Sequence, residues 1–358
     1  MRLEKVLKEM QKRQLMHLII SDPSSIDYLI NYKNNPGERM YLLLLSSDGH
    51  HKLFMNNLFY LDHEIDIEQV WYSDTDNYLQ LLADEFDGAC SIGIDKNFPA
   101  RFLMPLMDLV DECHFELGSE CVDRVRMVKD EKEQQLMIEA SKINDLVVDE
   151  VINICAKGNL TEKEVSDQLA GIYQKHGCTG NSFEPIVAYG KNGADNHHSG
   201  DDSILKPGDS IVIDIGGLYK GYCSDMTRTV FYKEVSPKQK AVYELVLKAQ
   251  KAAEAMIKPG VRLCDIDKCA RDIIAEGGYT VEFNHRLGHF IGRDVHEWGD
   301  VSQNYDIEVQ EGMTFSIEPG VYLQGEFGVR IEDLVLVTKE GCKVLNSYPK
   351  DLRVIGND

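Results

Sequence analysis

Two pairs of acidic residues lie symmetrically about turn-rich centres in the second half of the chain. Glu318 and Glu332 are each seven positions from Gly325 in SIEPGVYLQGEFGVRIED. Asp214 and Asp225 are equally far from a midpoint at 219.5 in IVIDIGGLYKGYCSDMTRTVFY. Both segments are rich in β-branched and aromatic residues, which favours strands on either side of a turn. The midpoints are 105.5 residues apart, and this spacing predicts a unit that occurs twice.

Helix signals repeat at nearly the same distance. The D-x-x-E sequence that begins at Asp130 is typical of a capping box, and Ser236-Pro237 is a second strong helix start. These two starts are 106 residues apart. Each predicted helix precedes a shorter one, and the four helices end near Gly158, Gly177, Pro259 and Gly277. We therefore predict a helix pair and a hairpin, repeated once, with internal pseudo-two-fold symmetry.

The first part of the chain has another pattern, in which short apolar segments alternate with helical ones. The predicted strands cover residues 17–21, 40–47, 52–57 and 91–95. Such alternation indicates an α/β domain with a covered sheet. We expect two domains, over residues 1–125 and 126–358, with the clustered chemistry confined to the second.

Charge and cysteine content restrict the partners. The chain has 38 Lys and Arg against 60 Asp and Glu, a net charge of −22, which repels nucleic-acid phosphates and anionic membrane surfaces. No apolar run approaches the ~20 residues of a membrane span, and no secretory signal is recognised. Nine cysteines without a Cys-x-x-Cys pair suit a reducing compartment. We expect a cytoplasmic protein that binds neither nucleic acid nor membrane.

Each predicted hairpin would bring two carboxylates together. Residues equidistant from the turn of an antiparallel hairpin face each other with Cβ atoms ~4.5–5.5 Å apart. Two carboxylates in such a position repel unless a cation neutralises them. Hard divalent ions prefer oxygen ligands, and pairs of these ions serve many hydrolases. In the structural alternative, the acids form ion pairs with Arg228, Arg330 or lysines.

Histidines extend the candidate ligand set. The segment NHRLGHFIGRDVHEWGD contains His285, His289 and His296, and ADNHHSG contains His197 and His198. Imidazole beside carboxylates suits Mn, Co or Zn. His285 and His289 do not form the helical zinc motif, because Arg follows His285 and glycines interrupt the segment.

In their order along the chain, these motifs resemble a known family. IDIGGLYKGYCSDMTRT, HRLGHFIGRDVHE, SIEPGVY and GVRIED look like the dinuclear-metal pita-bread peptidases, which include methionine aminopeptidase, aminopeptidase P and prolidase. This resemblance covers about residues 130–345. The preceding part, with SIDYLINY and NPGERMYLLLL, is similar to the N-terminal domain of creatinase and prolidase. The resemblance implies an α/β (α+β) chain with a creatinase-like domain before a pita-bread domain.

The resemblance implies five ligands for two divalent metal ions. Asp214 would be a terminal ligand of one ion. Asp225 and Glu332 would bridge both ions, and His289 and Glu318 would complete the second. Mn is the first expectation, although the same ligands accept Co, Zn or Fe. Glu318 would also be the general base toward a water held between the metals.

The resemblance also assigns two histidines to the substrate. His197 and His296 would contact the substrate and the developing oxyanion. The loop that commonly reads Pro-His-Gly in the family here reads Asn196-His197-His198, so His198 competes with His197 for this role.

Three further residues flank the acids. Thr227 and Arg330 would orient the metal ligands or contact the substrate, and the Arg330 guanidinium suits a substrate carboxylate. Arg228 is expected to orient carboxylates as well.

Among the functions in this family, cleavage before proline fits best. The extra N-terminal domain disfavours methionine aminopeptidase, and the complete ligand set disfavours creatinase. We expect an Xaa-Pro dipeptidase, which hydrolyses the bond before proline in dipeptides with a metal-bridged water. The alternatives are an Xaa-Pro aminopeptidase that acts on longer peptides and, from another class, a noncatalytic binding module of the same fold. A homodimer through the N-terminal domain is implied as well.

Overall fold

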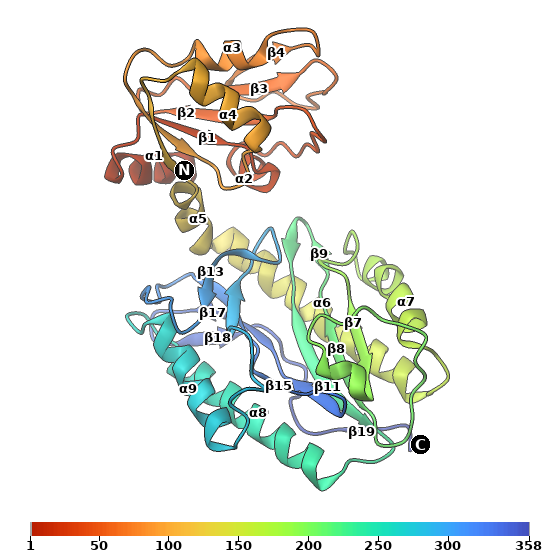
Figure 1. Ribbon diagram of the computed structural model, residues 1–358. Coiled ribbons are helices and arrows are strands. Elements are labelled where there is room, and N and C mark those ends of the chain that lie inside the picture. Colours follow the sequence, from red (N-terminus) through yellow and green to blue (C-terminus); the bar gives the residue numbers. More distant parts are fainter. Residues whose placement is uncertain (1, 358) are drawn as a thin grey trace. The chain divides into compact units, whose positions relative to one another are not determined.

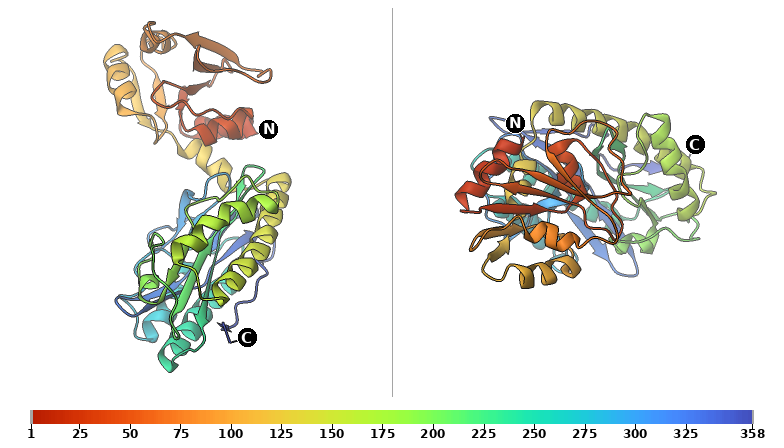
Figure 2. Two further views of the ribbon diagram at one scale, coloured as in Figure 1. Left: turned by 90° about the vertical axis from the view of Figure 1, so that its right-hand side faces the viewer. Right: turned by 90° about the horizontal axis from the view of Figure 1, so that it is seen from above.

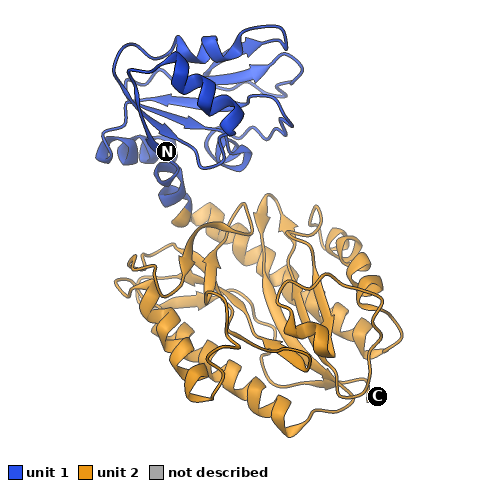
Figure 3. Ribbon diagram, viewed as in Figure 1, with its two compact units in different colours: residues 1–126 blue, residues 127–358 orange. Residues whose placement is uncertain are grey.

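The chain forms two structural units, of which the first ends at Arg126 and the second begins at Met127 (Figure 3). The computed structural model describes residues 2–357. Within this range no helix combines the length and the apolar character needed to cross a lipid bilayer.

The first unit is built on a six-stranded mixed sheet in the order β4-β3-β2-β1-β5-β6 (Figure 1). Strands β1, β2 and β3 are antiparallel neighbours, whereas β5 and β6 continue parallel to β1. Its elements are α1 (Arg2–Lys12), β1 (His17–Ile20), α2 (Pro23–Ile30), β2 (Leu42–Ser46), β3 (Lys52–Asn56), β4 (Glu68–Tyr72), α3 (Tyr78–Ala83), β5 (Ser91–Ile94), α4 (Ala100–Leu109), β6 (His114–Leu117) and α5 (Glu120–Met127).

Both faces of this sheet are covered, which confirms the predicted α/β pattern. Leu18 and Ile20 pack in a cluster with Val6 of α1, whereas Ile19 between them packs in a second cluster with Leu106 of α4. Strands β1, β2, β3 and β5 are those predicted. Strands β4 and β6 were missed because they are short edge strands with partly exposed residues.

The second unit repeats one series of elements. Two helices, two strands, a small ribbon and a third strand occur first in residues 131–232 and again in residues 237–337. The first series is α6 (Glu131–Ala156), α7 (Glu162–Lys175), β7 (Ile186–Tyr189), β8 (Ser210–Ile215), β9 (Leu218–Tyr219), β10 (Tyr222–Cys223) and β11 (Met226–Tyr232), with a 3-10 helix η1 (Gly190–Ala194) after β7. The second is α8 (Pro237–Met256), α9 (Leu263–Glu276), β12 (Gly288–Phe290), β14 (Thr314–Ile317), β15 (Gly320–Leu323), β16 (Phe327–Arg330) and β17 (Asp333–Val337), with the additional strands β13 (Glu297–Val301), β18 (Cys342–Val344) and β19 (Val354–Ile355).

Local capping explains where three of the four helices begin. The side chains of Asp130, Thr161 and Ser236 each accept a hydrogen bond from the backbone N–H three residues later, and in each case the side chain of that later residue accepts one from the backbone N–H of the capping residue. These capping boxes satisfy backbone donors that a helix start would leave unpaired. The helix starts predicted at Asp130 and Ser236 are confirmed.

The helices of each half pack on their own sheet. Residues of α6 and α7 share a core with β7, β8 and β11, and residues of α8 and α9 share one with β12, β14 and β17; Figure 2 shows α6 and α7 side by side over the strands. Ile213 and Ile215 belong to the first core, so the alternation of β8 directs Asp214 to the opposite face. The sheets therefore present their acidic side chains away from the helices.

The second hairpin has the predicted register. Ile317 pairs with Asp333, and Gly320 pairs with Arg330, so the midpoint is Gly325. Gly325 has φ +78°, a conformation that glycine adopts without strain. The pairing is interrupted where the chain passes from β14 to β15 and, opposite, from β16 to β17. Glu318 lies at the first of these breaks and Glu332 at the second.

The first hairpin differs from the prediction. Asp214 pairs with Thr227, and Asp225 is displaced by two positions. The predicted midpoint at 219.5 is wrong because the turn residues are Lys220 and Gly221, with φ 48° and 81°, which places the midpoint at 220.5. Positions displaced by two still share a face of the sheet and lie ~7–8 Å apart. Asp214 and Asp225 are thus diagonal neighbours rather than directly opposite.

Candidate metal centre

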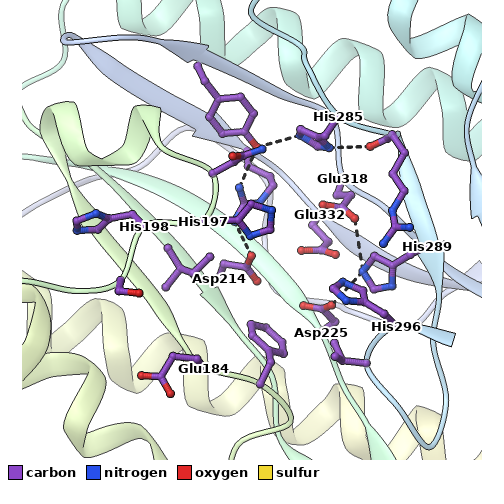
Figure 4. Close-up of a pocket in the computed structure, with 18 residues that line it drawn as sticks. Glu184, His197, His198, Asp214, Asp225, His285, His289, His296, Glu318 and Glu332 are labelled. Carbon is purple, nitrogen blue, oxygen red and sulfur yellow. Dashed lines mark hydrogen bonds and ion pairs between the residues drawn. The ribbon is translucent and has the colours of Figure 1, made fainter. Parts of the chain in front are cut away.

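A cavity of about 330 Å³ in the second unit brings the predicted site together (Figure 4). All five predicted ligands line it, and so do His197, His296 and Arg330. Thr227 lies directly behind the lining. The remaining lining residues are Phe183, Glu184, Ile186, Asn196, His198, Ser199, His285, Arg286, Val295 and Tyr322.

The ligand atoms converge from both halves of the unit. One ligand atom each from Asp225, His289 and Glu332 lie within 4.8 Å of one another, and all three residues are buried. The His289 Nε2 atom is 3.5 Å from a carboxylate oxygen of Asp225 and 3.5 Å from one of Glu318. Asp214 completes the lining on the side of β8. The first half thus contributes two carboxylates, and the second contributes two carboxylates and an imidazole.

The backbone around His289 prepares this imidazole for coordination. Its Nδ1 atom is 3.2 Å from the Phe290 carbonyl, which can only accept, so Nδ1 carries the proton and Nε2 presents its lone pair. A Cβ at Gly288 would lie 1.9 Å from the Ser316 carbonyl oxygen, so only glycine permits this approach of β12 to β14. The Ser316 hydroxyl accepts from the His289 N–H and donates to Glu318. Ser316 thereby fixes both ligands.

The electrostatics of the cluster call for added positive charge. Burial raises the pKa of Asp225 and Glu332 well above the ordinary range, raises the pKa of Glu318 to about 7, and lowers the pKa of His289. The Oδ1 atoms of Asp214 and Asp225 are buried without a protein partner. Buried carboxylates that face one another are stable only with a proton or a cation between them. Oxygen and imidazole donors fit Mn, Co, Zn or Fe.

Arg330 and Thr227 hold the carboxylates in place. The Thr227 hydroxyl donates to Glu332 at 2.7 Å and accepts from Arg330 Nε at 3.0 Å. The same guanidinium donates to Asp214 and to the Tyr322 hydroxyl. Two cavity carboxylates, Asp214 of the first half and Glu332 of the second, are therefore connected by Arg330, directly to Asp214 and through Thr227 to Glu332.

The family model described as metallopeptidase family M24 matches residues 135–339, a range that contains every one of these carboxylates and His289. The chain belongs to metallopeptidase family M24. A second model, the creatinase/prolidase N-terminal domain, matches residues 2–128. The resemblance to pita-bread peptidases and the predicted fold class are thus confirmed, and family M24 together with this donor set implies divalent metal ions.

Relatives in family M24 are similar over the whole chain. An Xaa-Pro dipeptidase from Pyrococcus horikoshii is 33% identical over 353 residues, which cover 98% of each chain. The crystal structure of a prolidase from Thermococcus sibiricus has a TM-score of 0.93 at 32% identity and covers 99% of this chain and 98% of that one. An X-Pro aminopeptidase from Thermotoga maritima has a TM-score of 0.81 at 29% identity and covers 97% and 100%.

The two loop histidines have different surroundings. The His197 ring faces the carboxylates, whereas His198 lies to the side of them (Figure 4). His198 Nε2 is 2.7 Å from the carboxylate of Glu162, which is fully buried at the start of α7. Glu162 also accepts from the backbone of Asp201. His198 therefore anchors the loop that carries His197.

Arg228 does not contact the carboxylates of the M24 cavity. It donates to the backbone carbonyls of Thr227 and Glu332, to Tyr348 and to the Asp333 carboxylate. Arg228 therefore orients a carboxylate, as expected, but that of Asp333, and it reaches Glu332 only through the backbone carbonyl.

Two of the cavity residues to which the sequence assigned no role are His285 and Tyr322. His285 was one of the histidines of the candidate ligand set and of the rejected zinc motif, whereas Tyr322 was in neither. The Tyr322 hydroxyl accepts from Arg330 and lies 3.0 Å from His285 Nε2, and burial lowers the pKa of His285 to about 3, so this histidine is neutral. Tyr322 is four positions after Glu318, and side chains an even number of positions apart in a strand point to the same face. This alternation could have placed Tyr322 in the cavity.

Proposed function

We propose that this chain is a metal-dependent Xaa-Pro dipeptidase, which hydrolyses the bond between the first residue and proline. The observation that carries the proposal is the convergence of four carboxylates and His289 in one cavity of an M24 chain. The relatives named Xaa-Pro dipeptidase and prolidase support the substrate, since they match nearly the whole chain. A cavity of about 330 Å³ is at the small end of the range for ligand sites, which favours a short peptide.

The proposed ligands divide between two ions. Asp214 would hold one ion, Asp225 and Glu332 would be shared by both, and His289 and Glu318 would hold the second. Bound divalent ions supply a Lewis acid and lower the pKa of water from about 15.7 toward 7. Arg330 and Thr227 keep the carboxylates in position, through the bonds to Asp214 and Glu332 described above.

Three side chains of the cavity perform the proton transfer and charge stabilisation. Glu318 accepts the proton of the attacking water and delivers it to the leaving proline nitrogen, a role worth about 10²–10⁴ in rate. Its pKa near 7 in the metal-free protein shows how strongly this cavity disfavours an uncompensated charge. His197 and His296 donate hydrogen bonds to the oxyanion that forms at the scissile carbonyl, each worth on the order of 3 kcal/mol. The His296 ring lies edge-on to His289 with centroids 4.3 Å apart.

Mn is the proposed metal, a homodimer the proposed assembly, and the cytoplasm the proposed compartment. The first unit exposes Leu58 by 68%, Tyr60 by 80% and Trp71 by 40%, and this apolar surface supports association through that unit. None of the nine cysteines is in a disulfide within residues 2–357, which suits a reducing compartment. Sedimentation should give about twice the monomer mass of 40.6 kDa, and a monomer at micromolar concentration would contradict the dimer.

The experiment that tests the function compares two substrates on metal-stripped protein reloaded with Mn²⁺. Release of proline from Ala-Pro, faster than release of alanine from Ala-Pro-Ala, is the expected result. The opposite preference would establish an Xaa-Pro aminopeptidase, for which the similarity to the T. maritima enzyme already gives an argument. Failure on both substrates with every metal would favour a noncatalytic binding module.

A further inference from the structure

A dipeptide substrate brings a charge that a longer peptide does not. Its C-terminal carboxylate is only one residue beyond the scissile bond and enters a cavity already lined by five carboxylates, those of the four acidic predicted ligands and of Glu184. Such an anion requires a cation. Within residues 2–357, the cavity lining includes two arginines, Arg286 and Arg330, and no lysine.

Arg330 is already engaged by protein groups. It is 3% exposed, and its three guanidinium nitrogens donate to Thr227, Tyr322 and Asp214. The Nε N–H is thus already used, and Nη1 and Nη2 each keep only one further N–H, so the two-point contact through Nε and Nη2 is closed to a substrate carboxylate.

Arg286 has a free edge. Its Nη1 atom donates to Asp300 on β13, while Nε and Nη2 have no protein partner among the described residues. Arg39, Arg262 and Arg271 of this chain use the corresponding Nε and Nη2 edge to bind both oxygens of a carboxylate. This two-point contact is the strongest geometry between arginine and a carboxylate. The Nε and Nη2 edge, which binds a carboxylate in three other arginines, therefore has no such partner in Arg286.

The backbone at Arg286 is held firmly. Its carbonyl lies 2.6 Å from the His285 ring nitrogen, and the next N–H donates to Asp267. Arg271 donates to the preceding carbonyl. The Arg286 side chain is 37% exposed and its partner Asp300 39%, so the tip reaches solvent while its base is fixed.

We propose that Arg286 binds the C-terminal carboxylate of the dipeptide through Nε and Nη2, with Asp300 positioning the guanidinium through Nη1. This proposal rests on the proposed dipeptidase function and names the residue that selects a free carboxylate directly after the scissile bond. In a longer peptide a neutral amide occupies that position. Arg286 thus favours dipeptides over longer peptides.

The test uses Ala-Pro and its C-terminal amide with the Mn-loaded protein. For Arg286→Gln we expect kcat/KM on Ala-Pro to fall about 10- to 100-fold, mainly through KM, because a charged hydrogen bond is lost. On the amide the change should stay within about two-fold, since the amide carries no charge for Arg286 to bind. Arg286→Lys should retain part of the preference, because a lysine keeps the charge but not the fork.

Arg293→Gln is the matched control. Arg293 is in the same segment but its guanidinium lies over the Tyr222 ring, outside the cavity lining. The Arg293→Gln substitution removes the same charge and should leave kcat/KM unchanged on both substrates. Asp300→Ala provides a second variant, with a smaller increase in KM for Ala-Pro alone.

Equal losses on both substrates for Arg286→Gln, or no loss on either, would overturn the proposal while leaving the dipeptidase function intact. If the Arg286→Gln protein does not fold, Asp300→Ala decides the test. An unchanged ratio of kcat/KM on Ala-Pro to kcat/KM on the amide in Asp300→Ala also overturns the proposal. Absence of cleavage of Ala-Pro by the unaltered protein would instead reject the dipeptidase function, and the role of Arg286 with it.

Discussion

Arg228 and Arg330 each extend from one half of the second unit to a carboxylate of the other half, but in opposite settings. Arg228, on β11, donates to Asp333, which also receives Lys350 and Gln250. Arg330, on β16, donates to Asp214 beside the cavity. Both guanidinium groups are nearly inaccessible, at 2% and 3% exposure. The Asp333 carboxylate is thus surrounded by protein donors, whereas the Asp214 carboxylate faces a cavity that could hold cations.

The different surroundings of Asp333 and Asp214 suggest different roles, one in stability and one in catalysis. The Asp333 carboxylate has its full complement of protein partners, so that network connects the halves whether or not metal is present. The Asp214 carboxylate has one oxygen without a protein partner. We therefore expect changes around Asp333 to act on folding and changes around Asp214 and Glu318 to act on turnover.

The largest expected effect is on turnover. Glu318→Gln should retain metal and lower kcat by about 10²–10⁴, because the amide cannot accept a proton from water. Initial rates on Ala-Pro with metal content measured on the same sample check this. Glu326→Gln is the matched control, since Glu326 is in the turn of the same hairpin and pairs with Lys238 at the surface. Near-normal activity of metal-loaded Glu318→Gln would remove Glu318 as the base.

Arg228→Met should have the next largest effect, on stability. Removal of one member of a buried ion pair leaves the other charge uncompensated, at a cost of about 3–5 kcal/mol in the free energy of unfolding. Urea unfolding of the Mn-loaded protein measures it, with Arg330→Met for comparison. The loss for Arg330→Met should be smaller, because bound cations compensate Asp214. Equal losses would abolish the distinction between the two arginines.

Relative to the metal-loaded protein, the metal-free protein should lose stability as the pH rises. The pKa of Glu318 is raised from 4.5 to about 7 in the folded protein, chiefly by burial. Between these pH values the folded state retains a proton that the unfolded chain has released, so the free energy of unfolding falls by on the order of 3 kcal/mol. Unfolding midpoints with chelator at pH 5 and pH 8, repeated with Mn²⁺, test it. The same slope with and without metal would show that the cluster does not cause it.

The smallest expected effect concerns the loop histidines. His198→Ala should cost about 1–2 kcal/mol in stability, because the hydrogen bond to buried Glu162 is lost, and should lower activity only a few-fold. His197→Ala should leave stability unchanged and lower kcat on the order of 10²-fold. Thermal unfolding and kcat on Ala-Pro distinguish the two. A reversed order would make His198 the substrate-facing residue.

Features encoded locally were predictable from the sequence. The capping boxes at Asp130 and Ser236 involve residues three positions apart, and Gly325 marks its own turn. The register of the first hairpin was not predictable, because its turn places Lys220 at positive φ, which lysine does not signal. One residue of error in the midpoint shifted the partner of Asp214 by two.

Side-chain partners that are far apart in the sequence could not be predicted either. Glu162 is 36 residues from His198, and Asp333 is 105 residues from Arg228. Sequence patterns located His198 and Arg228 near the acids along the chain but could not indicate the direction of either side chain. The five proposed ligands, which line one cavity, could be predicted together because a repeat and several motifs mark them independently.

The division of the ligands between two halves has a consequence for biosynthesis. Asp214 leaves the ribosome 118 residues before Glu332, which corresponds to about 6–24 s at ~5–20 residues per second. During that interval the proposed ligands of the second half, His289, Glu318 and Glu332, are not yet all synthesised. On the proposed ligand assignment the complete metal site therefore forms only after the second hairpin is made, and the nascent first half folds without it.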